Sequence, residues 1–239
     1  MKPRERIILA LDVSDHDEAI KIVHEFKDYI DIFKVGSELF TSVGPRLIKE
    51  INLMGKKVFL DLKFHDIPNT VTKSVLAAAR LRVFMLTVHT LGGLDMLKQA
   101  ADALGEFAIE NNITRPRLIG VTILTSMDQK ALSDEIGVAL RMSSQVKQLA
   151  KLARMAGLDG VVASAENATM IRSSAGEGFI IVTPGIRPSW APADDQKRTL
   201  TPKQAIRKGA DYIVIGRAVL AQPDPAKALM RIHDEIKNA

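Results

Sequence analysis

The stretch Lys57-Val58-Phe59-Leu60-Asp61-Leu62-Lys63-Phe64-His65-Asp66-Ile67-Pro68-Asn69-Thr70 joins an apolar, β-rich run to a cluster of charges. Its first part, residues 57–62, is expected to form a strand, because apolar and β-branched residues favour a buried strand. Side chains alternate between the two faces of a strand, so Asp61 and Lys63 are predicted to point the same way. The sequence therefore places two opposite charges at the carboxyl end of this strand.

Short apolar runs of this kind alternate with longer amphipathic runs along the chain, which is typical of repeated β-α units around a parallel sheet. We predict eight strands, at residues 6–12, 32–36, 57–62, 84–89, 117–123, 160–163, 179–183 and 212–216. Helices are predicted at residues 15–27, 44–54, 71–81, 92–110, 143–156, 166–173, 201–208 and 224–236. The length of 239 residues is close to the roughly 250 of one (β/α)8 barrel, so a single domain over residues 1–239 is expected.

Periodicity alone leaves a doubly wound open sheet as an alternative to a closed barrel. The polar residues at or just beyond the predicted strand ends favour the barrel, and they are Asp12, Lys34, Asp61, Lys63, His89, Thr125, Arg187 and Arg217. In a barrel the carboxyl ends of all strands converge on one mouth, where active sites lie. We therefore predict an α/β fold, a single (β/α)8 TIM barrel, with a charged mouth.

Composition argues against several classes of function. There is no cysteine, so there is no thiolate nucleophile, disulfide framework or cysteine zinc site. The 33 basic and 28 acidic residues are interspersed and aromatic residues make up only 5%, so nucleic-acid binding is not indicated. No run approaches the roughly 20 apolar residues of a membrane span, which predicts a cytoplasmic protein without membrane contacts. The net charge of +5 suits a small anionic substrate.

Lys34 lies inside the predicted strand 32–36, which a closed barrel buries on both faces, so its ammonium group needs an anionic neighbour. Asp12 ends the first predicted strand and is equally costly to bury alone. Taken singly, Asp12 is as well explained as a loop cap, and Asp61 with Lys63 as a structural ion pair. Taken together, adjacent strands supply an array of lysines and aspartates, which favours a functional site.

The last predicted strand ends in Ile215-Gly216-Arg217, where such barrels frequently bind phosphate. Gly216 permits close approach of a ligand, and Arg217 supplies a charged donor fork. A surface arginine after a turn glycine is the plainer alternative. The loop after the seventh strand adds Arg187, and Gln196 would reach a phosphate or a base edge if that loop folded over the site.

These segments together resemble the orotidine 5′-monophosphate decarboxylase family, in its bacterial form, over essentially the whole chain. The resemblance is carried by Ala10-Leu11-Asp12, Phe33-Lys34-Val35-Gly36, residues 61–70, Val121-Thr122-Ile123-Leu124-Thr125-Ser126, Thr183-Pro184-Gly185-Ile186-Arg187-Pro188, Asp194-Asp195-Gln196-Lys197-Arg198 and Ile215-Gly216-Arg217. It implies conversion of orotidine 5′-monophosphate to uridine 5′-monophosphate and carbon dioxide, in pyrimidine nucleotide synthesis. It also implies that neither a metal nor a cofactor takes part.

The resemblance implies catalytic roles for particular residues. Lys34, Asp61, Lys63 and Asp66 would form a charged array, in which Lys63 donates a proton to C6 of the pyrimidine. Asp66 and Thr70 would reach into the site of a neighbouring subunit. The working enzyme would therefore be a homodimer with shared active sites.

The resemblance also implies the substrate contacts. Asp12 and Lys34 would hold the ribose hydroxyls, and Asp61 would lie beside the carboxylate that leaves. The edge of the pyrimidine would be held by Thr125 and Ser126. The phosphate would be held by Arg187, Gln196, Gly216 and Arg217.

Two other functions fit parts of the pattern. A metal-dependent sugar-phosphate decarboxylase or aldolase on a similar barrel, of the keto-gulonate-phosphate decarboxylase kind, shares the Asp-x-Lys-x-x-Asp pattern of residues 61–66. That relative places an acidic residue at the end of its second strand to help hold magnesium, where this chain has Lys34, which would repel the ion. His65 and His89 lack metal-ligand spacing, so a structural role is expected for both. A noncatalytic nucleotide-binding barrel is the other alternative, and the intact charges of residues 61–66 argue against it.

Overall fold

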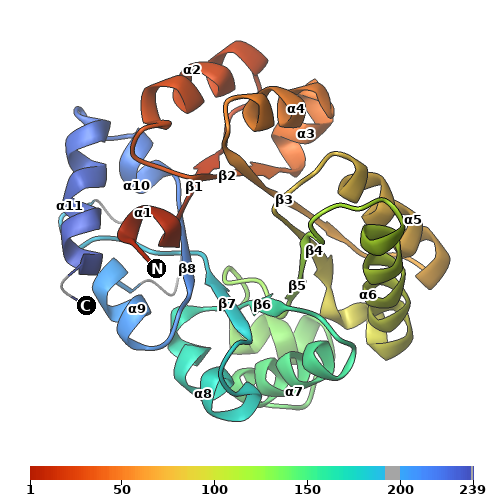
Figure 1. Ribbon diagram of the computed structural model, residues 1–239. Coiled ribbons are helices and arrows are strands. Elements are labelled where there is room, and N and C mark those ends of the chain that lie inside the picture. The colour runs from red at the N-terminus through yellow and green to blue at the C-terminus, as the bar shows by residue number, and fades with distance from the viewer. Residues whose placement is uncertain (192–199, 238) are drawn as a thin grey trace.

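A ring of parallel strands forms the centre of the structure, and helices surround it (Figure 1). The computed structural model describes residues 1–191, 200–237 and 239. The strands are β1 (Ile7–Leu11), β2 (Ile32–Gly36), β3 (Lys57–Phe64), β4 (Met85–His89), β5 (Arg117–Val121), β6 (Gly160–Val162), β7 (Ile180–Thr183) and β8 (Tyr212–Ile215). Each strand pairs with the next, and β8 pairs back with β1. The predicted closed (β/α)8 barrel is confirmed, and the open sheet is excluded.

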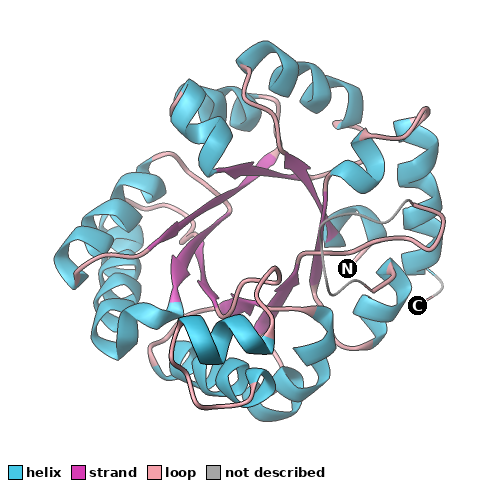
Figure 2. Cartoon of the chain, turned by 180° about the vertical axis from the view of Figure 1, so that it is seen from behind, coloured by secondary structure: helices cyan, strands magenta, loops and turns pink. Residues whose placement is uncertain are grey.

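Helices cover the outer side of the strands (Figure 2). All the predicted helices are present, as α2 (His16–Phe26), α4 (Arg46–Leu53), α5 (Pro68–Arg80), α6 (Gly93–Glu110), α7 (Met142–Met155), α8 (Ala165–Ala175), α9 (Pro202–Arg207) and α11 (Pro225–Lys237). Elements that were not predicted are α1 (Pro3–Arg6), α3 (Ser37–Val43), the 3-10 turn η1 (Thr90–Gly92), the π-helical turn η2 (Ala131–Glu135) and α10 (Arg217–Leu220). These elements are too short for a helical period to be read from the sequence. Within the described residues, no helix combines the length and apolar character that crossing a membrane requires.

Side chains on each strand alternate between two apolar cores. The inner core fills the barrel and consists of Ile8, Ile32, Phe59, Met85, Ile119, Val182 and Tyr212. The outer core lies between strands and helices, and takes intervening strand residues such as Leu9, Phe33 and Leu60. This two-sided burial explains why the strands are apolar on both faces. A polar side chain on an inner face near a carboxyl end therefore lies directly above the apolar filling of the barrel.

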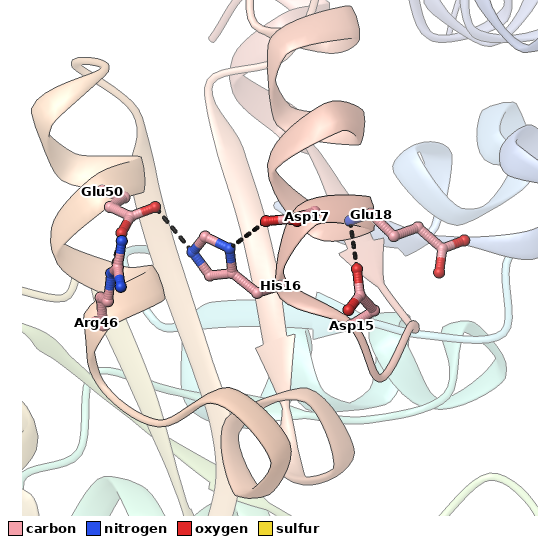
Figure 3. Close-up of polar contacts among 6 residues, drawn as sticks. All are labelled: Asp15, His16, Asp17, Glu18, Arg46 and Glu50. Carbon is pink, nitrogen blue, oxygen red and sulfur yellow. Dashed lines mark hydrogen bonds and ion pairs between the residues drawn. The ribbon is translucent and has the colours of Figure 1, made fainter.

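A histidine joins α2 to α4 on the outer side of the barrel (Figure 3). His16 Nδ1 lies 2.9 Å from Asp17 Oδ1, and its Nε2 lies 2.9 Å from Glu50 Oε2. Glu50 also accepts a hydrogen bond from Arg46 Nε at 2.7 Å, while Asp15 caps the start of α2. The pKa of His16 is raised above its ordinary value of 6.5, first by the hydrogen bond to Asp17 and then by the contact with Glu50.

We predict that His16 makes the free energy of unfolding depend on pH. Because folding raises its pKa, the contribution is fully present below 6.5 and is lost as the pH rises through the folded-state pKa. Replacing His16 with Asn removes this contribution. The excess stability of the wild type over His16→Asn, measured by urea denaturation, is therefore expected to shrink from about pH 5.5 to about pH 8.5. An excess that stays constant or grows over this interval would contradict the assignment.

Candidate functional site

Two ion pairs lie at the carboxyl ends of β1, β2 and β3. Lys34 Nζ donates to Asp12 Oδ1 at 2.9 Å, and Lys63 Nζ donates to Asp61 Oδ2 at 2.9 Å. The side chains of Lys34 and Asp61 are only 13% and 14% exposed, so each needs its partner to offset the loss of solvation. The anionic neighbour that the sequence requires for Lys34 is therefore Asp12, from the adjacent strand.

The strand register explains why these charges face the barrel axis. Ile32 and Phe59 belong to the inner core, and side chains two residues further along a strand share that face. This rule places Lys34 above Ile32 and Asp61 above Phe59. Gly36 is paired with Asp61 across β2 and β3, and Lys34 Nζ lies 3.0 Å from the position that a Cβ on Gly36 would take. The ammonium group of Lys34 therefore leans over Gly36, beside the strand position of Asp61.

Lys63 reaches Asp61 from an irregular end of β3. The pairing of β3 with β4 shifts between Leu60 and Phe64, and Lys63 has a φ of 52°. A left-handed backbone is strained for a residue other than glycine and costs on the order of 1 kcal/mol. The regular alternation predicted for this segment therefore fails beyond Asp61, although the two side chains do meet. Backbone strain of this kind is concentrated at functional sites.

Thr87, on β4, holds both members of the second ion pair. Its Oγ1 donates to Asp61 Oδ1 at 3.0 Å and accepts the backbone N–H of Lys63 at 2.9 Å. Thr87 is completely buried, so water does not compete for these hydrogen bonds. This residue was not among the predicted site residues. The signal that would have found it is a polar residue two positions after Met85 in an otherwise apolar strand.

A cavity of about 230 Å³ opens beside the first ion pair. Asp12, Lys34, Arg187, Gly216 and Arg217 are among its lining residues, and they come from β1, β2, the loop after β7 and the end of β8. Three cations and one carboxylate thus border one space, which suits an anionic group such as a phosphate. A Cβ at position 216 would lie 3.1 Å from Asp12 Oδ2, so the glycine leaves room for that carboxylate.

Asp66 and Thr70 lie away from this cavity, at the start of α5, and both are exposed. Asp66 Oδ1 accepts the backbone N–H of Ile67 at 2.7 Å, so within one chain it holds the turn into the helix. Neither residue is among the described residues that line the cavity, and the same is true of Asp61 and Lys63. Within one chain, Lys34 is paired with Asp12 and Lys63 with Asp61, whereas Asp66 is hydrogen-bonded to the backbone of Ile67.

Two other predicted residues lie on the loop after β5. Thr125 is half-buried and Ser126 is exposed, and neither is among the described residues that line the cavity. Gln196 lies outside the described residues. Within the part of the chain that is described, no three His, Asp or Glu side chains are gathered in a way that could hold a metal ion.

His65 and His89 stack at the edge of the same end of the barrel, with ring centroids 5.3 Å apart. Burial is the main cause that lowers the pKa of His89, and the nearby charges of His65 and Lys63 lower it further. His89 Nδ1 accepts the backbone N–H of Leu91 at 3.4 Å. These contacts fit the structural role expected for both histidines from the sequence.

Comparison with known proteins agrees with this geometry. The family model described as "Orotidine 5'-phosphate decarboxylase / HUMPS family" matches residues 5–232. The chain belongs to this family. It is 50% identical over 235 residues to an orotidine 5′-phosphate decarboxylase of Nitrosococcus oceani, covering 98% of this chain and 99% of that protein. It is 47% identical over 237 residues to the protein of the same name from Moorella thermoacetica, covering 99% and 94%.

A solved structure extends the similarity to three dimensions. The crystal structure of orotidine 5′-phosphate decarboxylase from Lactobacillus acidophilus superposes with a TM-score of 0.84 at 38% sequence identity, covering 99% of this chain and 100% of that one. The resemblance to the decarboxylase family that residues 10–12, 33–36 and 61–70 carry is therefore confirmed over the whole chain.

We predict that Thr87→Val destabilises the fold although it preserves the shape of the side chain. Valine cannot hydrogen-bond, so the buried Lys63 N–H and Asp61 carboxylate would each lose a partner. Leaving such groups unsatisfied is expected to lower the free energy of unfolding by about 1 to 3 kcal/mol, measured by urea denaturation. Thr87→Ser, which keeps the hydroxyl group, is the matched control and should lose less. Equal stability of Thr87→Val and the wild type would show that these hydrogen bonds contribute nothing.

Proposed function

We propose that this chain converts orotidine 5′-monophosphate to uridine 5′-monophosphate and carbon dioxide, with Lys63 as the proton donor to C6. The activity is supported by family membership and by relatives of that name over essentially the whole chain. The observation that carries the residue roles is the Lys63–Asp61 pair at 2.9 Å, which Thr87 holds at the same end of the barrel as the arginine-lined cavity.

The reaction develops one negative charge, on C6 of the pyrimidine, and the protein must stabilise it. The bond between C6 and the carboxylate breaks with both electrons remaining on C6, and carbon dioxide leaves. The resulting carbanion lies in the plane of the pyrimidine ring, so the ring π system cannot delocalise it. An ammonium group fixed close to C6 stabilises this charge without having to reorganise. Lys63 would supply that group, give a proton to C6 and then regain one from solvent.

Asp61 would act on the substrate before the bond breaks. Its carboxylate is fixed by Thr87 and by Lys63 and is 14% exposed, so it cannot turn freely toward water. A substrate carboxylate placed beside it would be repelled, which raises the energy of the bound ground state relative to the transition state. In this pair the carboxylate of Asp61 would therefore disfavour the substrate carboxylate, and the ammonium group of Lys63 would favour the carbanion.

The phosphate end would supply the binding energy that holds the substrate in this environment. Arg187 and Arg217 border the cavity, and interactions remote from the reacting carbon can offset the cost of placing two carboxylates together. Gly216 permits the close approach, and Asp12 with Lys34 would hold the ribose between the two ends. Three further contacts are proposed from the family resemblance, and they are Thr125 and Ser126 at the pyrimidine edge and Gln196 at the phosphate.

Lys34 argues against the metal-dependent sugar-phosphate alternative. Its ammonium group is paired with Asp12 at 2.9 Å and leans over Gly36, at the end of the second strand. A divalent cation placed there would be repelled, and the carboxylate of Asp12 is already engaged. Two wider expectations stay predictions, namely that residues 1–239 form one domain and that the protein works in the cytoplasm.

The proposed role of Lys63 is tested by Lys63→Ala. This variant is expected to bind uridine 5′-monophosphate about as well as the wild type, because the product carries no developing carbanion. Its turnover of orotidine 5′-monophosphate is expected to fall by about a thousandfold or more, since proton donor and electrostatic stabiliser are lost together. Calorimetry measures the binding, and loss of substrate absorbance measures the turnover.

Lys151→Ala, on the exposed surface of α7, is the matched control and should keep wild-type turnover. Wild-type turnover in Lys63→Ala would remove Lys63 from the mechanism. Loss of product binding together with turnover would instead assign Lys63 to binding.

We also propose that Asp66 and Thr70 complete the site of a second subunit, as the family resemblance implies. Both are exposed at the mouth end of the barrel, where Lys63 and Asp61 lie. Large apolar side chains are exposed on the same side, and they are Ile67, Leu91, Leu94 and Leu124, in segments that follow β3, β4 and β5. Such apolar side chains beside polar ones are what a homodimer interface requires.

A hybrid dimer tests the shared site. Lys63→Ala and Asp66→Ala chains are co-expressed with different affinity tags and purified on both tags in sequence. Each hybrid contains one complete site, with Lys63 from one chain and Asp66 from the other, so about half of the wild-type activity per dimer is expected. Either variant alone should be nearly inactive. A hybrid as inactive as its parents would show that Asp66 serves its own chain.

A further inference from the structure

A second cavity lies at the opposite end of the barrel from the charged mouth. Its volume is about 520 Å³, larger than the 230 Å³ of the cavity that Arg217 borders. Its lining residues belong to residues 52–57, 82–84 and 112–117, which lead from α4, α5 and α6 into β3, β4 and β5. These segments meet at the amino ends of the strands, so the cavity is separate from the catalytic site.

The lining of this cavity carries five cations, which are Lys56, Lys57, Arg82, Arg115 and Arg117. No aspartate or glutamate is among the described residues that line it. Like charges gathered around one concavity repel one another, and a bound anion offsets that repulsion.

Two carboxylates lie close behind the lining and neutralise only part of this charge. Asp159 is bonded to Arg115 at 2.6 Å, and Asp31 lies 3.5 Å from Lys56. Asp31 is shared, because it also forms an ion pair with Arg4, whose hydrogen bond lowers the pKa of Asp31. Two carboxylates, one of them shared, therefore face five cations, and an excess of positive charge is left for a ligand.

An aromatic ring arranges two of the cations. Lys57 Nζ lies 4.9 Å and the Arg117 guanidinium 4.7 Å from the centroid of Phe84. Arg117 also donates to the hydroxyl group of Tyr212, which fixes its position. Because cations already lie over the Phe84 ring, this cavity favours the anionic part of a ligand over an aromatic base.

Arg82 occupies a backbone position where glycine is the ordinary choice. It follows the end of α5 with a φ of 56°, whereas the corresponding residues after α4, α7 and α9 are Gly55, Gly157 and Gly209. An arginine is strained there, and the guanidinium forms no ion pair or hydrogen bond within the described residues. The backbone turn is held by hydrogen bonds, from Arg82 N–H to the Ala79 carbonyl at 2.9 Å and from Asn52 Nδ2 to the Leu81 carbonyl at 2.9 Å, but a glycine could form the same turn without strain. The exposed guanidinium of Arg82 therefore adds a cation to the cavity that the turn itself does not need.

We propose that this cavity binds a small polyanion that carries two or more phosphate groups. Cations from three separate segments surround it, so several anionic oxygens can be contacted at once. Guanidinium groups bind phosphate through paired hydrogen bonds, and Arg82 is available for this purpose. The site would act in addition to the substrate's phosphate site, from which it is separated by the inner core of the barrel.

The test is a calorimetric titration of the full chain with inorganic tripolyphosphate, in the presence of saturating uridine 5′-monophosphate to occupy the mouth. The wild type is expected to bind. Arg82→Gly removes one cation and relieves the left-handed strain, so it should weaken tripolyphosphate binding roughly tenfold. The same variant should keep its decarboxylase activity and melt at an unchanged or higher temperature.

Two control variants separate charge from backbone. Asn112→Gly relieves a φ of 46° in the same cavity without removing charge, and should bind like the wild type. Arg154→Ala removes a cation from the exposed surface of α7, and should also bind like the wild type. Absence of tripolyphosphate binding in the wild type would overturn the proposal. So would equal weakening by Arg82→Gly and Arg154→Ala, because diffuse surface charge would then explain the affinity.

Discussion

Lys34 brings an ammonium group that is 13% exposed to the end of an apolar strand, and Asp12 on the neighbouring strand compensates it at 2.9 Å. This contact exists only because β1 and β2 are adjacent, and β1 is adjacent to β8 only because the barrel closes. Closure therefore brings Asp12, Lys34 and Arg217 to one cavity from the two ends of the chain. The charged mouth is therefore a consequence of the sheet having no edge.

The mouth is organised at some cost to stability. Asp61 is nearly buried, and Lys63 adopts a left-handed backbone that a glycine would adopt without strain. Buried charges lose solvation, so apolar residues of similar size at positions 61 and 63 would be expected to give a more stable fold. The buried hydroxyl group of Thr87 limits the cost by bonding to both residues. Two opposite charges are thus fixed at a short distance at some cost to stability, which is the arrangement that the proposed stabilisation of a carbanion requires.

Much of the fold could be predicted because burial follows simple periods. Alternate residues of a strand belong to the inner and the outer core, so a strand is recognised in the sequence as a short and mostly apolar run. The predicted bounds of β2 agree with the observed ones. The helix predicted at 44–54 begins only at Arg46. Gly44, the first residue of the predicted helix, instead terminates the unpredicted α3 with a φ of 70°. A glycine before a helix and a glycine after one have similar sequence surroundings, and only tertiary packing decides between them.

The residues of the site also divide into those that the sequence predicts and those that it does not. Asp12, Lys34 and Arg217 were recognised because each is a charge at the end of an apolar strand, and the structure brings them together. Thr87 was missed because a threonine inside a strand is ordinary, and its importance depends on the adjacent strand. The backbone of Lys63 could not be foreseen either, since a left-handed residue at the end of a strand leaves no local pattern.

We propose that protein side chains, and no metal ion, promote the breaking of the bond between C6 and the carboxylate. The most direct measurement is the turnover of orotidine 5′-monophosphate by chelator-treated wild-type protein, followed by absorbance with carbon dioxide collected in parallel. One equivalent of carbon dioxide for each uridine 5′-monophosphate formed, at a rate that added magnesium leaves unchanged, is the predicted result. Turnover that chelation abolishes and magnesium restores would contradict the account.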